Sequence, residues 1–243
     1  MLAIRKSSTL QQFSIRKLSS FKCDPIISLP YFERPIPIVL LAGEGLKKSV
    51  WNSTAKFLSA RGFCGMIMEI PTDIEDIDKV TDNIHLAVQI EKLNNPILIT
   101  NSVGTFIAQK YLESYSAAAM VLINPIPPQN YMKNIDKLID SNYFVDSDTI
   151  KKYKTLSYPK FIQNITNDSQ VNIEPNACKM LVITTKGDDN VIDADIDIKT
   201  LKSYHNIDDN DIIQLYDVNS RLPFITDPDI CHKVIYDFID TIY

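Results

Sequence analysis

Ser102 is a candidate nucleophile in this sequence. It lies in the segment Pro96–Leu112, where an apolar strand pattern, a sharp turn and a helix pattern follow one another. The turn reads Thr100-Asn101-Ser102-Val103-Gly104. A serine hydroxyl needs a neighbouring base to take its proton before it can attack a carbonyl. The alternative is a structural role, because serine is a favoured helix N-cap.

The sequence offers few partners for such a nucleophile. Asp188 and Asp189 lie in an acidic stretch after an apolar run, and an ordinary surface turn explains them equally well. The three histidines are His85, in a predicted helix, His205, before a predicted strand, and His232, within the last predicted helix. We interpret all three as ordinary surface or packed histidines.

Short apolar runs alternate with longer helical patterns after the first 35 residues or so. The predicted strands are 38–42, 66–70, 97–100, 118–123, 180–185 and 212–216, and the predicted helices are 50–60, 77–93, 103–114, 196–204 and 227–242. This order predicts parallel βαβ units and therefore an α/β fold with a doubly wound, mostly parallel sheet. Between residues 126 and 176 the alternation weakens, which indicates a small helical lid inserted into the sheet order.

Length and composition predict one domain with a sizeable core, since the chain has 243 residues, 45% of them apolar, and a net charge of -5. No run approaches the roughly 20 apolar residues of a transmembrane helix, and the acidity disfavours nucleic acid as a partner. The four cysteines lack the Cys-x-x-Cys or Cys/His spacing of zinc sites. We therefore expect no metal, no cofactor, no nucleic acid and no transmembrane segment.

Residues 1–22 differ from the rest and are typical of a mitochondrial transit peptide. They contain five serines and five basic residues but no acidic residue, and apolar side chains interleave with the basic ones. Arg16 to Ser20 resembles a matrix-protease site, with cleavage after Leu18. A disordered basic tail on a cytosolic protein is the alternative. Loss of the five cations would change the net charge from -5 to -10 and leave residues 23–243 as an acidic domain.

The segment Pro96–Leu112 is similar to the nucleophile elbow of α/β-hydrolases, in which the pattern G-x-S-x-G presents a serine above the sheet. Gly104 matches the second glycine of that pattern, and Thr100 replaces the first. The resemblance extends from about Pro35 to Ile242. It implies the α/β-hydrolase fold, with Ser102 at the position of the nucleophile.

The resemblance also implies an oxyanion hole and an acid. The run Pro37–Leu46 looks like the strand and loop that end in a His-Gly pair, with Ala42-Gly43 here, so the backbone N–H groups of Glu44 and Val103 would face an oxyanion. The stretch Lys186–Ile192 is similar to the one that carries the acid. Asp189 is the candidate, with Asp188 as the fallback.

The histidine of the family is missing at its expected position. The last helix opens Ile225-Thr226-Asp227-Pro228-Asp229, and counting back from it places Arg221 where the family has its histidine. An arginine, with a pKa above about 12, cannot serve as a general base near neutral pH. If Asp189 and Arg221 meet, they form an ion pair rather than a proton relay.

These departures predict a hydrolase-fold protein that lacks hydrolytic activity. With the leader, they predict a protein of the mitochondrial matrix that serves as an interaction or assembly factor for a mitochondrial complex. Two alternatives stay open. One is a divergent serine esterase, thioesterase or acyltransferase that uses Ser102. The other is a non-catalytic binder of a small acyl ligand, held between the sheet and the lid.

Overall fold

The computed structural model describes residues 23–26, 34–43, 46–70, 76–125, 177–185, 202, 207, 211–218, 220 and 222–243. The predicted leader (residues 1–22), the predicted lid (126–176) and nearly all of the predicted helix 196–204 lie outside the described residues. Among the described residues, no helix is long and apolar enough to cross a membrane.

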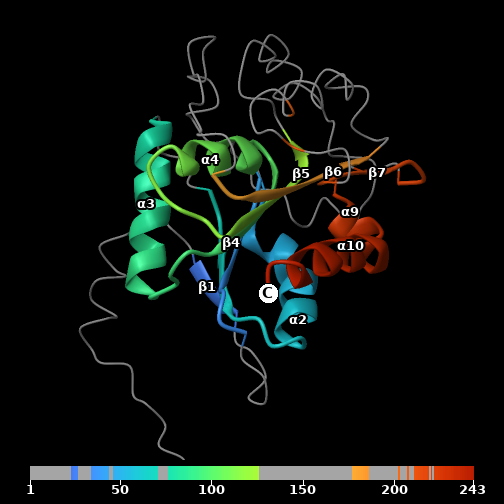
Figure 1. Ribbon diagram of the computed structural model, residues 1–243, viewed down its shortest axis with the longest axis horizontal. Coiled ribbons are helices and arrows are strands. Elements are labelled where there is room, and N and C mark those ends of the chain that lie inside the picture. The colour runs from blue at the N-terminus through green and yellow to red at the C-terminus, as the bar shows by residue number, and fades with distance from the viewer. Residues whose placement is uncertain are drawn as a thin grey trace, which may run out of the picture.

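A twisted sheet forms the middle layer of the molecule, with helices on both faces (Figure 1). Its elements are β1 (Cys23–Ile26), β2 (Ile38–Leu41), the short 3-10 helix η1 (Lys48–Trp51), α2 (Asn52–Ser59), β3 (Gly65–Met68), α3 (Ile77–Ile90), β4 (Ile97–Ser102), α4 (Val103–Leu112), β5 (Ala119–Pro125), β6 (Lys179–Thr185), β7 (Ile212–Leu215), α9 (Pro223–Thr226) and α10 (Pro228–Asp240). The strand order is β1-β3-β2-β4-β5-β6-β7. Strands β2 to β7 are parallel, and β1 pairs antiparallel with β3 at the edge.

Alternate side chains of the central strands enter two separate cores, which is why their sequences are apolar without interruption. In β2, Val39 and Leu41 face the core under α3 and α4, whereas Ile38 and Leu40 face the core under α2 and α10. All four are at most 3% exposed. The predicted doubly wound, mostly parallel sheet is therefore confirmed.

Two local predictions need correction. Strand β1 was not predicted, because Cys-Asp-Pro-Ile contains a proline, which is tolerated only at a sheet edge such as this one. The helix predicted from Asp227 to Ile242 is present as α10, but a short helix that was not predicted, α9, precedes it and ends just before Asp227. Pro228 does occupy the first turn of α10, but the Asp227 carboxylate accepts a hydrogen bond from the Thr226 hydroxyl (2.7 Å) instead of capping the helix.

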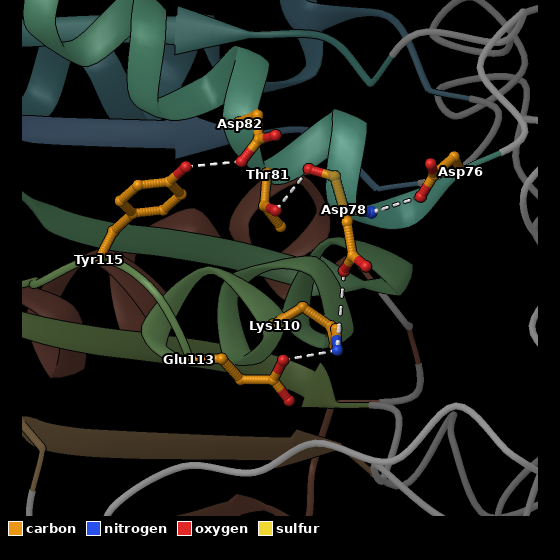
Figure 2. A network of polar contacts seen from close by, with 7 residues as sticks. All are labelled: Asp76, Asp78, Thr81, Asp82, Lys110, Glu113 and Tyr115. Atoms are coloured by element: carbon orange, nitrogen blue, oxygen red, sulfur yellow. Dashed lines mark hydrogen bonds and ion pairs between the residues drawn. The ribbon is translucent and has the colours of Figure 1, made fainter.

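Polar contacts between α3 and α4 hold the helix that follows Ser102 in place (Figure 2). The Lys110 ammonium of α4 lies 2.5 Å from Glu113 and 3.7 Å from Asp78, and the Tyr115 hydroxyl donates to Asp82 at 2.5 Å. The carboxylate of Asp76 accepts the backbone N–H of Asp78 and caps α3. The contact of Lys110 with Glu113 is shielded more than an ordinary surface pair, because the two side chains are 13% and 18% exposed, whereas Asp78 is largely exposed.

Candidate functional site

The strand order reverses at β2, which makes the carboxyl ends of β2 and β4 a topological switch point. From β2 the chain passes to β3 on one side and then crosses to β4 on the other. In open parallel sheets, ligands bind outside the carboxyl ends of the strands at such a reversal. Gly43 follows β2, and Ser102 ends β4. Topology alone therefore brings the predicted nucleophile to the edge of the sheet where ligands bind.

Ser102 has the strained backbone of a nucleophile elbow. Its dihedral angles are φ 49° and ψ -125°, a combination that L-residues rarely adopt and that costs on the order of 1–3 kcal/mol. Its side chain makes no capping hydrogen bond to α4, and the residue is 2% exposed. The N-cap alternative is thus wrong for the Ser102 side chain, and the sharp strand-to-helix turn is present as predicted.

Gly104 is what lets this turn pass so close to β2. A methyl group at Gly104 would lie 3.3 Å from the carbonyl oxygen of Leu41 and 3.6 Å from Cβ of Thr100. Thr100 replaces the first glycine of the family pattern, and its side chain faces Gly104, the second one. The buried Thr100 hydroxyl has no hydrogen-bond partner among the described residues. The turn therefore requires a small residue at position 104, while position 100 accommodates a threonine.

Asn101 connects the elbow to the loop after β2. The backbone N–H of Gly43 donates to Asn101 Oδ1 at 3.0 Å, and Asn101 is fully buried. A methyl group at Gly43 would lie only 2.8 Å from the carbonyl oxygen of Asn101. Gly43 immediately precedes Glu44, the residue whose N–H the family resemblance assigns to the oxyanion hole. Asn101 therefore fixes the backbone from which that loop begins.

A second strained residue lies directly beside Ser102. In the pairing of β4 with β5, Asn101 is opposite Ile123 but Ser102 is opposite Pro125, so Asn124 is the extra residue of a bulge. Asn124 has φ 45° and is fully buried. Bulges commonly re-aim side chains next to functional sites. Here the side chain is directed to β6, where its Oδ1 accepts the Thr185 N–H at 2.9 Å and its Nδ2 donates to Thr185 Oγ1 at 3.0 Å.

The same edge includes the turn before α9. The hydroxyl of Thr185 donates to the carbonyl oxygen of Ser220 at 2.8 Å, and Ser220 Oγ accepts the N–H of Leu222 at 3.1 Å. Sequence reasoning missed Asn101, Asn124 and Thr185. For Asn124 one signal was available, an asparagine between an apolar strand and Pro125, because asparagine tolerates positive φ better than most residues.

Of the predicted site residues, the structure describes Ser102 and Val103, the latter being the first residue of α4 and 1% exposed. Glu44, Asp189, its fallback Asp188 and Arg221 lie outside the described residues. Described residues adjoin the segment that contains Asp189 and the position of Arg221. Thr185 precedes the Lys186–Ile192 stretch, and Ser220 and Leu222 flank Arg221.

The two described histidines make contacts away from Ser102. The ring of His232 is buried against α2, with Nε2 3.0 Å from Thr54 Oγ1 and the Phe57 ring 4.7 Å away. The ring nitrogens of His85 lie within hydrogen-bond distance of Tyr111 and Gln89. Their interpretation as packed histidines is confirmed. His205 lies outside the described residues.

Burial lowers the pKa of His232 below its ordinary value of 6.5, and the positive charge of Arg61 lowers it further, while Asp229 opposes the shift. Among the described residues, no cluster of His, Cys, Asp or Glu could hold a metal ion.

The chain is similar in fold to several solved enzymes, among them esterases and an epoxide hydrolase. An esterase of Thermogutta terrifontis superposes with a TM-score of 0.68 at 13% identity, over 91% of this chain and 93% of its own. The chain has the α/β-hydrolase fold. A carboxylesterase of Nitrososphaera gargenis (TM-score 0.67, 14% identity, 91% and 94% covered) and an epoxide hydrolase of Bacillus megaterium (0.67, 12%, 90% and 96%) have it too.

This likeness confirms the predicted fold and carries no activity with it, because the identities are 12–14%. The amino-acid sequence matches no protein-family model and no curated protein. Function must therefore be argued from the residues at the carboxyl edge of the sheet.

Proposed function

We propose that this chain is a mitochondrial α/β-hydrolase-fold protein without hydrolytic activity, which serves in the matrix as an interaction or assembly factor for a mitochondrial complex. The observation that carries the proposal is the contrast between an intact elbow at Ser102 and the two described histidines, both of which are engaged elsewhere. The His232 ring lies against Thr54 and Phe57, and the His85 ring lies against Tyr115. Neither is available to take a proton from Ser102.

The position of the family's histidine supports the same proposal. Arg221 stands there, and an arginine is protonated throughout the physiological pH range. Removal of one member of a catalytic triad typically lowers turnover by on the order of 10⁴ or more. Ala42, in place of the histidine before Gly43, is a second departure from the hydrolase pattern. Two independent losses favour a protein released from selection for hydrolysis.

The mitochondrial part of the proposal rests on residues 1–22 alone, with their five basic residues and no acidic residue. The acidity of the remaining chain disfavours RNA and anionic membrane surfaces as its partners. A protein complex of the matrix is therefore the partner that we propose.

One observation favours the alternative of a divergent serine esterase, thioesterase or acyltransferase. Backbone strain of the kind seen at Ser102 persists where the surrounding structure over-determines it, and such strain clusters at active sites. The base would then come from a residue outside the described part of the chain, with His205 the remaining histidine. Binding of a small acyl ligand without turnover would use the same edge of the sheet.

A fluorophosphonate probe, which labels activated serines, tests the proposal directly. We expect the wild-type protein to be labelled no more than its Ser102→Ala variant, and we expect an affinity-tagged copy to recover a stable protein complex from mitochondria. Labelling of the wild type that Ser102→Ala abolishes would refute the inactive assignment. Absence of both labelling and stable partners would favour the ligand binder.

A further inference from the structure

Asn124, Thr185 and Ser220 form a chain of hydrogen bonds that links the ends of β5 and β6 to the turn before α9. Asn124 and Thr185 are fully buried, so the bonds between them are shielded from water, whereas the bond to Ser220 is partly buried. Asn124 reaches Thr185 with both ends of its amide. Thr185 in turn reaches the carbonyl oxygen of Ser220 at 2.8 Å.

The direction of the Thr185 hydroxyl proton decides whether these hydrogen bonds extend to Ser220. Thr185 Oγ1 has one proton, and two acceptors are near it: Ser220 O at 2.8 Å and Asn124 Oδ1 at 3.3 Å. The shorter distance favours Ser220. Because Nδ2 of Asn124 donates to the same oxygen at 3.0 Å, Oγ1 is satisfied as an acceptor and its proton remains available for Ser220.

The bulge at Asn124 is what makes this arrangement possible. With φ 45° the residue leaves the regular strand, and its side chain turns toward β6 rather than into either core. The positive φ of Asn124 costs free energy. The bulge nevertheless lets the Asn124 side chain bond to Thr185. The backbone N–H of Thr185, the last one of β6, is bound by Asn124 as well.

We propose that Asn124 and Thr185 are positioning residues that hold the carboxyl ends of β5 and β6 to the turn before α9. Thr185 is the residue from which the chain enters the Lys186–Ile192 stretch with Asp189, and Ser220 is the residue before Arg221. One buried pair thus sets the starting points of the two segments in which the family resemblance places Asp189 and Arg221. The inference goes beyond the proposed function and does not depend on whether Ser102 is active.

The neighbouring residue Thr184 provides a matched control. It is on the same strand and is 2% exposed, but its hydroxyl has no hydrogen-bond partner among the described residues. Thr184→Val and Thr185→Val therefore make the same chemical change at adjacent buried positions. Only the second breaks the link to Ser220.

Amide hydrogen exchange of the full-length protein, read on peptides that cover residues 218–226, tests the proposal. We expect Thr185→Val to accelerate exchange there roughly tenfold, because it removes the hydroxyl that donates to the Ser220 carbonyl oxygen, and Thr184→Val to leave it unchanged. Thr185→Ser retains the hydroxyl and should restore the wild-type rate. Asn124→Gly tolerates the positive φ, removes the amide and should accelerate the same peptides.

Equal acceleration by the two valine variants, or acceleration by Thr185→Val that is uniform over the whole chain, would overturn the proposal. So would wild-type exchange in Asn124→Gly, which serves as the test if Thr185→Val does not fold. These outcomes are independent of probe labelling at Ser102. Labelling of the wild type would remove the inactive assignment and leave the positioning role of Asn124 and Thr185 intact.

Discussion

The backbone N–H of Gly43 and the side-chain Oδ1 of Asn101 lie 3.0 Å apart and form a buried hydrogen bond between the end of β2 and the residue before Ser102. Asn101 Nδ2 has no partner among the described residues. An unsatisfied buried donor costs about 1–3 kcal/mol, so Asn101 is a poor choice for stability alone. Its place is explained by the geometry that it imposes on the loop after β2.

Gly43 has no room for a side chain, which gives a first prediction. In Gly43→Ala the new methyl group would lie 2.8 Å from the carbonyl oxygen of Asn101, and backbone must move to relieve the contact. We expect a loss of about 1–3 kcal/mol in the free energy of unfolding, measured with urea. Gly104→Ala, whose methyl group would lie 3.3 Å from Leu41 O, should cost less. Equal stability of Gly43→Ala and wild type would contradict the described path of the loop.

The strain at Ser102 can be measured with a pair of variants. Ser102→Ala and Ser102→Gly both remove the hydroxyl, but only glycine adopts φ 49° and ψ -125° without a steric penalty. We expect Ser102→Gly to be more stable than Ser102→Ala by roughly 1–3 kcal/mol in urea unfolding. At an ordinary helix N-cap the two variants would differ little, and the glycine variant would have no advantage.

Sequence reasoning found the strands because each central strand is apolar on both faces, as a sheet with two cores requires. It found the turn at Ser102 because a glycine follows two residues later, where strand and helix backbones approach. It could not find the bonds from Asn101 to Gly43 or from Asn124 to Thr185, since each joins residues about 60 positions apart. In a chain rich in Asn and Asp, such residues indicate turns first, and their partners become known only once the strand order is known.

The buried His232 predicts a loss of stability in mild acid. Its pKa is lowered mainly by burial, so the unfolded chain binds the proton more readily than the folded chain does. The stability that the neutral ring confers is complete above pH 6.5 and is lost as the pH falls from there through the lowered pKa of the folded state. His232→Gln should flatten the decline in urea stability between about pH 7 and pH 5. An unchanged slope would show that His232 does not titrate across folding.

Import depends on the cationic character of the leader, if residues 1–22 are a transit peptide. Replacement of Arg5, Lys6, Arg16 and Lys17 by glutamine should leave the protein in the cytosol, because the segment loses most of its positive charge but keeps its apolar side chains. Fractionation of cells that express the variant gives the measurement. Mitochondrial accumulation at the wild-type level would contradict the transit-peptide hypothesis.

The last prediction asks whether the missing base alone explains inactivity. Arg221→His would put an imidazole at the position where the family has its histidine, and we expect weak fluorophosphonate labelling at Ser102 that the wild type lacks. Arg221→Ala should give none, and it should cost stability only if Arg221 is paired with Asp189 away from water. Labelling is expected to stay weak even with the histidine restored, because Glu44 would put a carboxylate beside the oxyanion position and Ala42 remains in place of the second histidine. Robust esterase activity of the wild type, abolished by Ser102→Ala, would instead establish the divergent hydrolase. The search for its base would then turn to His205, since Thr54 and Phe57 already hold the ring of His232.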